Sequence, residues 1–227
     1  MQRILDIILS GIALIVLSPL LIPLICILRI TGEGEIFFLQ DRVGFGGKRF
    51  KLYKFATMVK NSPNIGTGTV TIKNDPRILP LGGILRKTKI NELPQLINIF
   101  NGDMSVIGPR PQTKRCFDAF SDSAQKDIMN VRPGLSGIGS VIFRNEENMM
   151  HANADPDLLY DTVIMPYKGK LESWYAKNSS VLNYILLIAL TVYVILFRST
   201  RFIFWCYPSL PRPPEVMRDY ISSDYYE

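Results

Sequence analysis

The residues best suited to chemistry lie in one short stretch, INELPQLINIFNG, which runs from Ile90 to Gly102. Its apolar residues recur with the spacing of one helix face, which predicts a helix. Asn91 is expected to cap that helix, Glu92 to occupy its first position and Gly102 to end it. A helix start presents free N–H groups and a positive dipole, so this pair lies where phosphate binds well. The same pattern also describes an ordinary capped amphipathic helix.

Arginines near this stretch could extend the site. Arg86 precedes it by a few residues, and Arg110 lies in Gly108-Pro109-Arg110-Pro111, where two prolines restrict the backbone. Arg132 and Arg144 follow the same logic more weakly. A guanidinium group matches phosphate oxygens bidentately. Each arginine alone is more often a surface residue, but several near a helix start indicate a diphosphate site.

The N-terminal region is expected to associate with a membrane. Ile7 to Leu28 contains no charged residue and is long enough to span a bilayer. Ser18-Pro19 interrupts this run near its middle, and proline breaks or kinks a helix. Each half would be about 11 residues or roughly 16 Å long, about half the hydrocarbon thickness. A re-entrant hairpin and a straight span both remain open, and Ser18 is expected to bond a carbonyl that Pro19 leaves free.

The remaining chain alternates short strand and helix signals. Ile36 to Gln40, Phe50 to Phe55 and Gly66 to Ile72 read as strands. Val181 to Phe197 is apolar but short for a span, so it is expected to lie at the membrane interface or in the core. Residues 208–227 carry four prolines and four acids, which predicts an extended, flexible tail.

Composition narrows the function further. The 227 residues suffice for one sizeable domain, and the net charge is +6. A basic run follows the first apolar segment, which suits anionic lipids and phosphorylated ligands. It consists of Arg42, Lys48, Arg49, Lys51, Lys54 and Lys60. Three distant cysteines fit a reducing environment, and a single histidine excludes multi-histidine metal sites. No nucleic-acid motif is present, so a nucleic-acid partner is not expected.

Together these residues resemble the bacterial sugar transferases known as small monotopic phosphoglycosyl transferases. The resemblance runs from Arg3 to Phe197. It is carried by Asp6, Ser18-Pro19, Gln40 to Gly44, Asn74 to Arg77, Arg86 to Thr88, Glu92 to Leu96, Gly102 to Pro111 and Arg132 to Gly137. The GDMS and GPRP blocks that follow ELPQL are highly specific.

The resemblance implies a mainly helical α+β fold in a monotopic membrane protein, with a re-entrant helix hairpin and a compact cytosolic catalytic domain with short strands. It divides the chain into a hairpin (1–31), a catalytic domain (32–180), an interfacial or core helix (181–207) and the tail (208–227). It also implies a UDP-sugar donor, undecaprenyl phosphate as acceptor, Mg²⁺ and a place on the cytosolic face of the bacterial inner membrane, among its phospholipids. The oligomeric state is left open by the resemblance, with a homodimer as one alternative.

The resemblance also implies a two-step reaction. In the family an Asp-Glu pair opens the helix: the Asp attacks the sugar-linked phosphate and displaces UMP, and the Glu is thought to hold the metal. The family's phosphate-binding arginines fall on Arg86, Arg110 and Arg144.

This chain departs from the pattern, because Asn91 stands at the Asp position and a neutral amide is a poor nucleophile. Glu172 and Asn183 also stand where aspartates are usual. We therefore assign catalysis to the pair Asn91 and Glu92, with Glu92 carrying the chemistry and the metal. The alternative is an inactive paralogue or variant that binds UDP-sugar or lipid phosphate and scaffolds a glycan-assembly complex.

Overall fold

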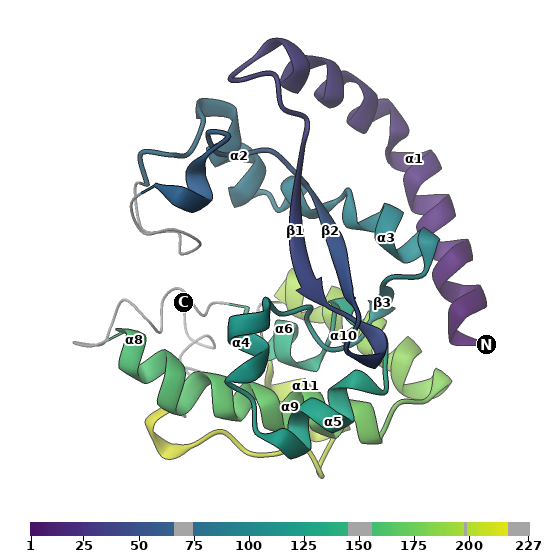
Figure 1. The fold of residues 1–227 in the computed structure, drawn as a ribbon. Helices are drawn as coiled ribbons and strands as arrows, with labels where there is room; N and C mark the ends of the chain where they lie inside the picture. The colour runs from purple at the N-terminus through teal and green to yellow at the C-terminus, as the bar shows by residue number, and fades with distance from the viewer. Residues whose placement is uncertain (66–74, 145–155, 198, 218–227) are drawn as a thin grey trace. The chain divides into compact units, whose positions relative to one another are not determined.

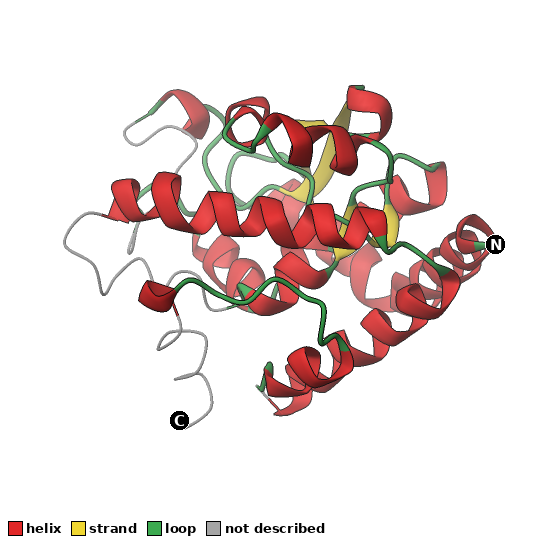
Figure 2. Ribbon diagram, turned by 90° about the horizontal axis from the view of Figure 1, so that it is seen from below, coloured by secondary structure: helices red, strands yellow, loops and turns green. Residues whose placement is uncertain are grey.

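The computed structural model describes residues 1–65, 75–144, 156–197 and 199–217, and within these ranges the chain is mainly helical with short strands (Figures 1 and 2). The α-helices are α1 (Gln2–Ile30), α2 (Pro80–Lys87), α3 (Gln95–Asn101), α4 (Lys114–Asp118), α5 (Asp122–Met129), α6 (Ile138–Ile142), α8 (Pro156–Leu159), α9 (Met165–Lys177), α10 (Val181–Phe197) and α11 (Arg201–Cys206). The strands are β1 (Phe37–Val43), β2 (Arg49–Phe55), β3 (Ser105–Ile107) and β4 (Gly134–Ser136). The expected mainly helical fold with short strands is confirmed, while the strand expected at Gly66 to Ile72 lies outside the described residues.

The chain forms two compact units. Unit 1 comprises residues 1–6, residues 42–50 and the chain from Gly102 onward, and unit 2 comprises residues 7–41 and 51–101. Strands β1 and β2 pair as a hairpin around the short 3-10 turn η1 (Phe45–Gly47). The strands expected at Ile36 to Gln40 and Phe50 to Phe55 are thus present, and β1 extends to Val43. A short connection of this kind requires antiparallel strands.

Helix α1 is a single curved helix that contains both Pro19 and Pro23 (Figure 1). The expected break therefore does not end the helix, and the described chain shows no hairpin of two helices. Ser18 gives the physical reason, because its Oγ donates to the carbonyl oxygen of Ile15 at 2.7 Å. That carbonyl is the one that Pro19 leaves without its usual N–H donor, so the expected role of Ser18 is confirmed.

Length and composition alone make α1 the one helix in the described ranges that could cross a membrane. Its outward side chains are apolar and exposed, among them Ile4, Ile12, Ile15 and Val16. Leu21, Leu24 and Leu28 are buried instead. They form the core of unit 2 with residues of β2 and α2, namely Phe55 and Leu85.

Unit 1 is organised around the parallel pair of strands β3 and β4, in which Ser105 lies opposite Gly134 and Ile107 opposite Ser136. The larger core of this unit joins β3 and α6 to α9 and α10. Helix α10 has the same bounds as the predicted apolar segment. One of its faces is buried in the core, and the other exposes apolar side chains such as Leu182, Ile185 and Val192.

Residues 208–217 correct the expectation of a flexible tail. Leu210 and Met217 are buried in the core of unit 1. The hydroxyl of Tyr167 donates to the carbonyl oxygen of Pro211 at 2.8 Å. Apolar residues spaced between the prolines fix this segment, which its polar and proline-rich composition concealed. The rest of the tail lies outside the described residues.

Candidate active site

The proposed catalytic pair lies in a 3-10 turn, η3 (Ile90–Glu92), and not at the start of an α-helix. Helix α3 begins at Gln95, so the expected cap at Asn91 is wrong. Lys89 adopts a left-handed backbone with φ of 60° between the end of α2 and the start of η3. Gly102 follows the last residue of α3 with φ of 99°, which confirms the predicted end of that helix.

Packing against the core fixes this turn. Ile90 and Leu93 are partly buried against the cluster that contains Leu24 and Leu28 of α1. Asn91 and Glu92, which lie between them, are therefore held against the same cluster as α1 by their own neighbours. This arrangement brings the turn and the apolar α1 together inside unit 2.

Asn91 and Glu92 differ in environment. Asn91 is only 8% exposed, and its Oδ1 atom has no hydrogen-bond partner among the described residues. The Glu92 side chain is 18% exposed, and its Oε1 atom lies 3.8 Å from Nζ of Lys54 on β2. Glu92 is thus the carboxylate of the pair, and it retains access to solvent.

A buried amide connects α3 to the strand that carries Lys54. Asn98 is fully buried. Its Oδ1 accepts a hydrogen bond from the backbone N of Tyr53 at 2.9 Å, and its Nδ2 donates to the carbonyl oxygen of Lys51 at 2.8 Å. Both bonds satisfy groups that would otherwise be costly to bury, so they fix α3 against β2. Lys54 is thereby positioned opposite Glu92.

Arg86 lies in the last turn of α2 and belongs to unit 2, like Asn91 and Glu92. The carbonyl oxygen of Arg86 accepts a hydrogen bond from the backbone N of Lys89 at 3.1 Å, so α2 ends directly before η3. Gly82 allows α2 to approach the chain at Thr57, since a Cβ atom there would lie 2.1 Å from the Thr57 carbonyl oxygen. The position of Arg86 therefore depends on this glycine.

Arg110 is displayed by a tightly bonded loop in unit 1. The backbone N of Gly108 donates to the Ser136 carbonyl at 2.9 Å, and that of Gly134 donates to the Pro109 carbonyl at 2.8 Å. A Cβ atom at Gly134 would lie 2.0 Å from the Gly108 nitrogen, so only glycine permits this approach. The specific GPRP block therefore serves to build a rigid loop.

Glu172 of α9 supports the same loop from within the core. It is 3% exposed, and its Oε1 accepts from the backbone N of Arg110 at 3.2 Å. Its Oε2 has no hydrogen-bond partner in the part of the chain that the structure describes. Burial raises the pKa of this carboxyl to about 7, against the opposing effects of the Arg110 N–H and the Lys168 charge. A neutral carboxyl is thus favoured inside the protein.

Arg144 follows α6 in unit 1, and the residue is exposed. One of its guanidinium nitrogens donates to the carbonyl oxygen of Val194 on α10 at 2.6 Å. Arg86 and the Asn91–Glu92 turn thus belong to unit 2, whereas Arg110 and Arg144 belong to unit 1.

These residues lie in a chain that matches a known protein family. The family model for bacterial sugar transferases matches residues 1–198. The chain belongs to this family. The resemblance drawn from its motifs is thereby confirmed.

Several curated relatives of this sugar transferase carry specific names. It is 34% identical over 213 residues to the undecaprenyl-phosphate galactose phosphotransferase of Salmonella typhimurium, which covers 87% of this chain and 41% of the relative. It is also 34% identical over 197 residues to an Aeromonas hydrophila enzyme, UDP-N-acetylgalactosamine-undecaprenyl-phosphate N-acetylgalactosaminephosphotransferase, covering 86% and 43%. The exopolysaccharide production protein ExoY of Sinorhizobium fredii is 34% identical over 159 residues, covering 64% and 70%. The sugar transferase thus spans less than half the length of the first two.

Three residues that matter to the site's geometry were not assigned from the sequence. Lys54 was visible only as one member of a basic run, Asn98 as one polar position in a helix, and Glu172 as a departure from the family pattern. The signal for Glu172 is a single acid within an otherwise buried helix face, beside Leu171 and Tyr175. The partners of all three are distant in sequence, so local pattern alone does not identify their roles.

Proposed function

We propose that the chain transfers a sugar 1-phosphate from a UDP-sugar to undecaprenyl phosphate and releases UMP, the first membrane-committed step of bacterial surface-glycan assembly. One observation carries this proposal: the Asn91–Glu92 turn packs through Ile90 and Leu93 on the same core cluster as the apolar helix α1. A site built on a membrane helix suits a lipid-borne acceptor. The names of the curated relatives support the same substrates.

Glu92 is the group we assign to the chemistry. Its carboxylate oxygen would form a bond to the sugar-linked phosphorus while the bond to the UMP oxygen breaks and UMP departs. The lipid phosphate oxygen would then attack that phosphorus and release the Glu92 carboxylate. Its solvent access supports this role, whereas Asn91 is buried and a poor nucleophile. Lys54 offsets the repulsion between two negative groups.

Arg86, Arg110 and Arg144 are proposed to bind the donor's diphosphate. A guanidinium fork matches two phosphate oxygens and stabilises the charge that develops on the departing phosphate. The rigid loop and the buried Glu172 beneath Arg110 favour this role, because a preorganised cation needs no rearrangement during reaction.

Mg²⁺ is the cofactor that we propose for this site. The described residues hold no group of three His, Cys, Asp or Glu side chains arranged for a metal. Mg²⁺ commonly binds through one or two protein oxygens together with substrate phosphates. Glu92 and the unpaired Oδ1 of Asn91 offer such oxygens, so the donor set fits. When bound, the ion would neutralise phosphate charge.

The membrane topology that we propose is re-entrant, with α1 entering and leaving the cytosolic leaflet of the inner membrane. Asp6 near one end accepts hydrogen bonds from Ser105, the backbone N of Val106 and Tyr184, each at 2.8 Å. Leu28 near the other end is buried against residues of unit 2. Both ends thus pack on parts of the chain outside the helix, which supports the re-entrant proposal.

Label transfer tests the proposed function. Membranes that contain the protein are incubated with a panel of radiolabelled UDP-sugars and undecaprenyl phosphate. Label should appear in the lipid fraction for at least one sugar, with UMP as co-product. If no sugar is transferred while Asn91→Asp transfers one, the chain is the binding and scaffolding form and the proposed activity is wrong.

A further inference from the structure

Helix α10 exposes an apolar stripe that the proposed transfer reaction does not use. Its outward residues recur at intervals of three and four, which is the spacing of one helix face. They are Leu182, Ile185, Ala189, Val192 and Leu196. The opposite face, which includes Tyr184 and Val194, is buried in the core of unit 1. A continuous exposed apolar surface of this kind marks a contact with a membrane or with another protein.

An aromatic cluster extends this stripe onto α11. The ring centre of Tyr193 lies 4.9 Å from that of Phe197 and 5.3 Å from that of Phe202. The Phe202 ring in turn stacks on Trp205, with the ring centres 5.2 Å apart. Trp205 is 74% exposed, so the cluster presents its largest ring to the surroundings. Helix α11 lies beyond residues 1–198, the part that matches the family model, so the family match does not account for it.

The length and packing of α10 suit a helix that lies on a membrane and does not cross it. Its 17 residues, at about 1.5 Å each, extend about 25 Å, which is less than the hydrocarbon thickness of about 30 Å. Its inner face is packed against the core of unit 1, so lipid could reach only the outer stripe. Helices with one apolar face lie in the plane of the interface, and tryptophan rings gather at the same depth.

The charges of this region favour an anionic bilayer over a second copy of the chain. Residues 181–212 contain no acid and three basic residues, which are Arg198, Arg201 and Arg212. The guanidinium carbon of Arg212 lies 5.3 Å from the centre of the Phe204 ring of α11. A basic residue near an anionic membrane surface contributes about 1 kcal/mol to binding. Two copies that docked through this face would instead bring like charges together, without an acid in this segment to pair them.

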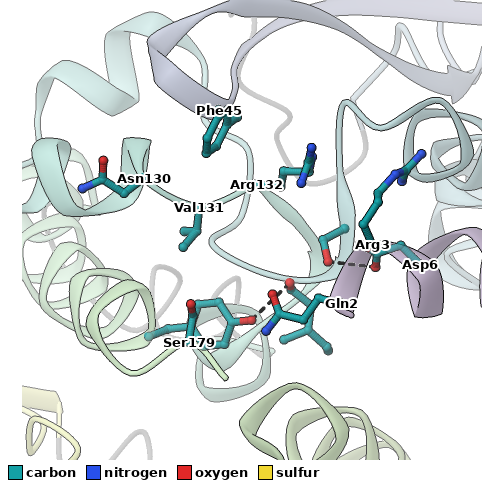
Figure 3. A pocket seen from close by; sticks show the side chains of 11 residues that line it. Gln2, Arg3, Asp6, Phe45, Asn130, Val131, Arg132 and Ser179 are labelled. Atoms are coloured by element: carbon teal, nitrogen blue, oxygen red, sulfur yellow. Dashed lines mark hydrogen bonds between the residues drawn. The ribbon is translucent and has the colours of Figure 1, made fainter. Parts of the chain in front are cut away.

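Polar residues mark the border of this surface at the start of α10. Ser179 precedes the helix and lines a polar cavity of unit 1 together with Gln2 and Asn130 (Figure 3). The apolar stripe begins three residues later, at Leu182. At the other end of α10 the stripe continues into the aromatic cluster. The surface therefore follows α10 and α11 and changes to polar residues before them.

We propose that the outer faces of α10 and α11 form a second membrane contact, which lies at the boundary between headgroups and acyl chains of an anionic phospholipid bilayer. This contact belongs to unit 1, whereas α1 belongs to unit 2 from Ile7 to its last residue. Each unit is then held at the bilayer by a surface of its own. The contact does not depend on donor binding or on transfer, so it can be tested without a nucleotide.

Fluorescence quenching of Trp205 tests this contact directly. The chain has two tryptophans, Trp174 and Trp205, so Trp174→Phe leaves Trp205 as the only one. The full chain is reconstituted in vesicles of phosphatidylglycerol and phosphatidylcholine, with or without phosphatidylcholine brominated near the carbonyl end of its acyl chains. The brominated lipid should lower Trp205 fluorescence about twofold, because the ring lies at the depth of the bromine atoms. Iodide in the aqueous phase should quench it little.

A reporter on another exposed part of unit 1 provides the control. Arg115→Trp, introduced together with Trp174→Phe and Trp205→Phe, places the only tryptophan on the exposed side of α4. Iodide should quench this ring, and the brominated lipid should not. If Trp174→Phe fails to fold, the difference in quenching between the parent and Trp205→Phe gives the same quantity, because the ring that Trp205→Phe removes is exposed.

Three results would overturn the proposal. Quenching of Trp205 by iodide but not by the brominated lipid would show that the surface faces water. Protection of Trp205 from both quenchers would assign the surface to a second copy of the chain or to another protein segment. Quenching by the brominated lipid should weaken in vesicles without phosphatidylglycerol, because the basic residues then lose their anionic partners. Equal quenching with and without phosphatidylglycerol would contradict the anionic bilayer.

Discussion

Glu172 is the residue with the clearest predicted pH dependence. Its carboxyl has a pKa of about 7 in the folded chain, against an ordinary 4.5, because burial disfavours the charged form. The folded state thus holds a proton that the unfolded state releases, so stability is full below pH 4.5 and falls as the pH rises to about 7. The shift corresponds to about 3 kcal/mol.

Glu172→Gln should remove that dependence. The free energy of unfolding of the parent, measured by urea denaturation from pH 4.5 to 7.5, should fall by about 3 kcal/mol relative to the variant. Glu33→Gln, which removes an exposed carboxyl, serves as the control and should follow the parent. Parallel curves for the parent and Glu172→Gln would show that the buried group does not titrate in this range.

Arg110 allows a second test at this scale. Arg110→Lys keeps the charge but loses the bidentate fork, so the affinity for a UDP-sugar should fall about tenfold or more. Isothermal titration of the purified chain measures it whether or not turnover occurs. Arg115→Lys, an exposed substitution on α4, should bind like the parent. Equal binding by both variants would make Arg110 a structural residue.

At the scale of elements, two adjacent glycines of α2 give a matched pair. A Cβ atom at Gly82 would lie 2.1 Å from the Thr57 carbonyl oxygen, whereas one at Gly83 meets only Ile78, at 4.0 Å. Gly82→Ala should destabilise the chain by about 1–3 kcal/mol and displace Arg86. Gly83→Ala should stabilise it by about 0.5–1 kcal/mol, because alanine favours the helix. Thermal unfolding of both variants measures this difference, and equal Tm values would contradict the close packing of α2.

Some boundaries of the helices and strands could be predicted from the sequence, and others could not. The strands β1 and β2, the end of α3 at Gly102 and the bounds of α10 follow from local strand signals, a glycine and a run of apolar residues. The start of α3 does not, because the left-handed Lys89 and the packing of Ile90 turn an expected helix start into a 3-10 turn. The network at Asp6 joins residues about 100 and 180 positions apart, which no local pattern reveals.

At the scale of the whole molecule, the proposed topology places both ends of α1 in the cytosol. Gln2→Cys and Glu33→Cys, each in a background without the native cysteines, should be shielded from an impermeant thiol reagent in intact cells. Both should react after permeabilisation. Labelling of Gln2→Cys alone in intact cells would show a straight span and contradict the re-entrant topology.

We propose that Glu92 carries out phosphate transfer beside a buried, neutral Asn91. Release of UMP from a UDP-sugar in the presence of undecaprenyl phosphate measures it directly, with the parent, Glu92→Gln and Asn91→Asp assayed side by side. The parent should release UMP, and Glu92→Gln should lose at least about a hundredfold in rate, as removal of a reacting group causes. UMP release by Glu92→Gln at the parental rate would contradict this proposal. It would also be contradicted if the parent released no UMP and Asn91→Asp did.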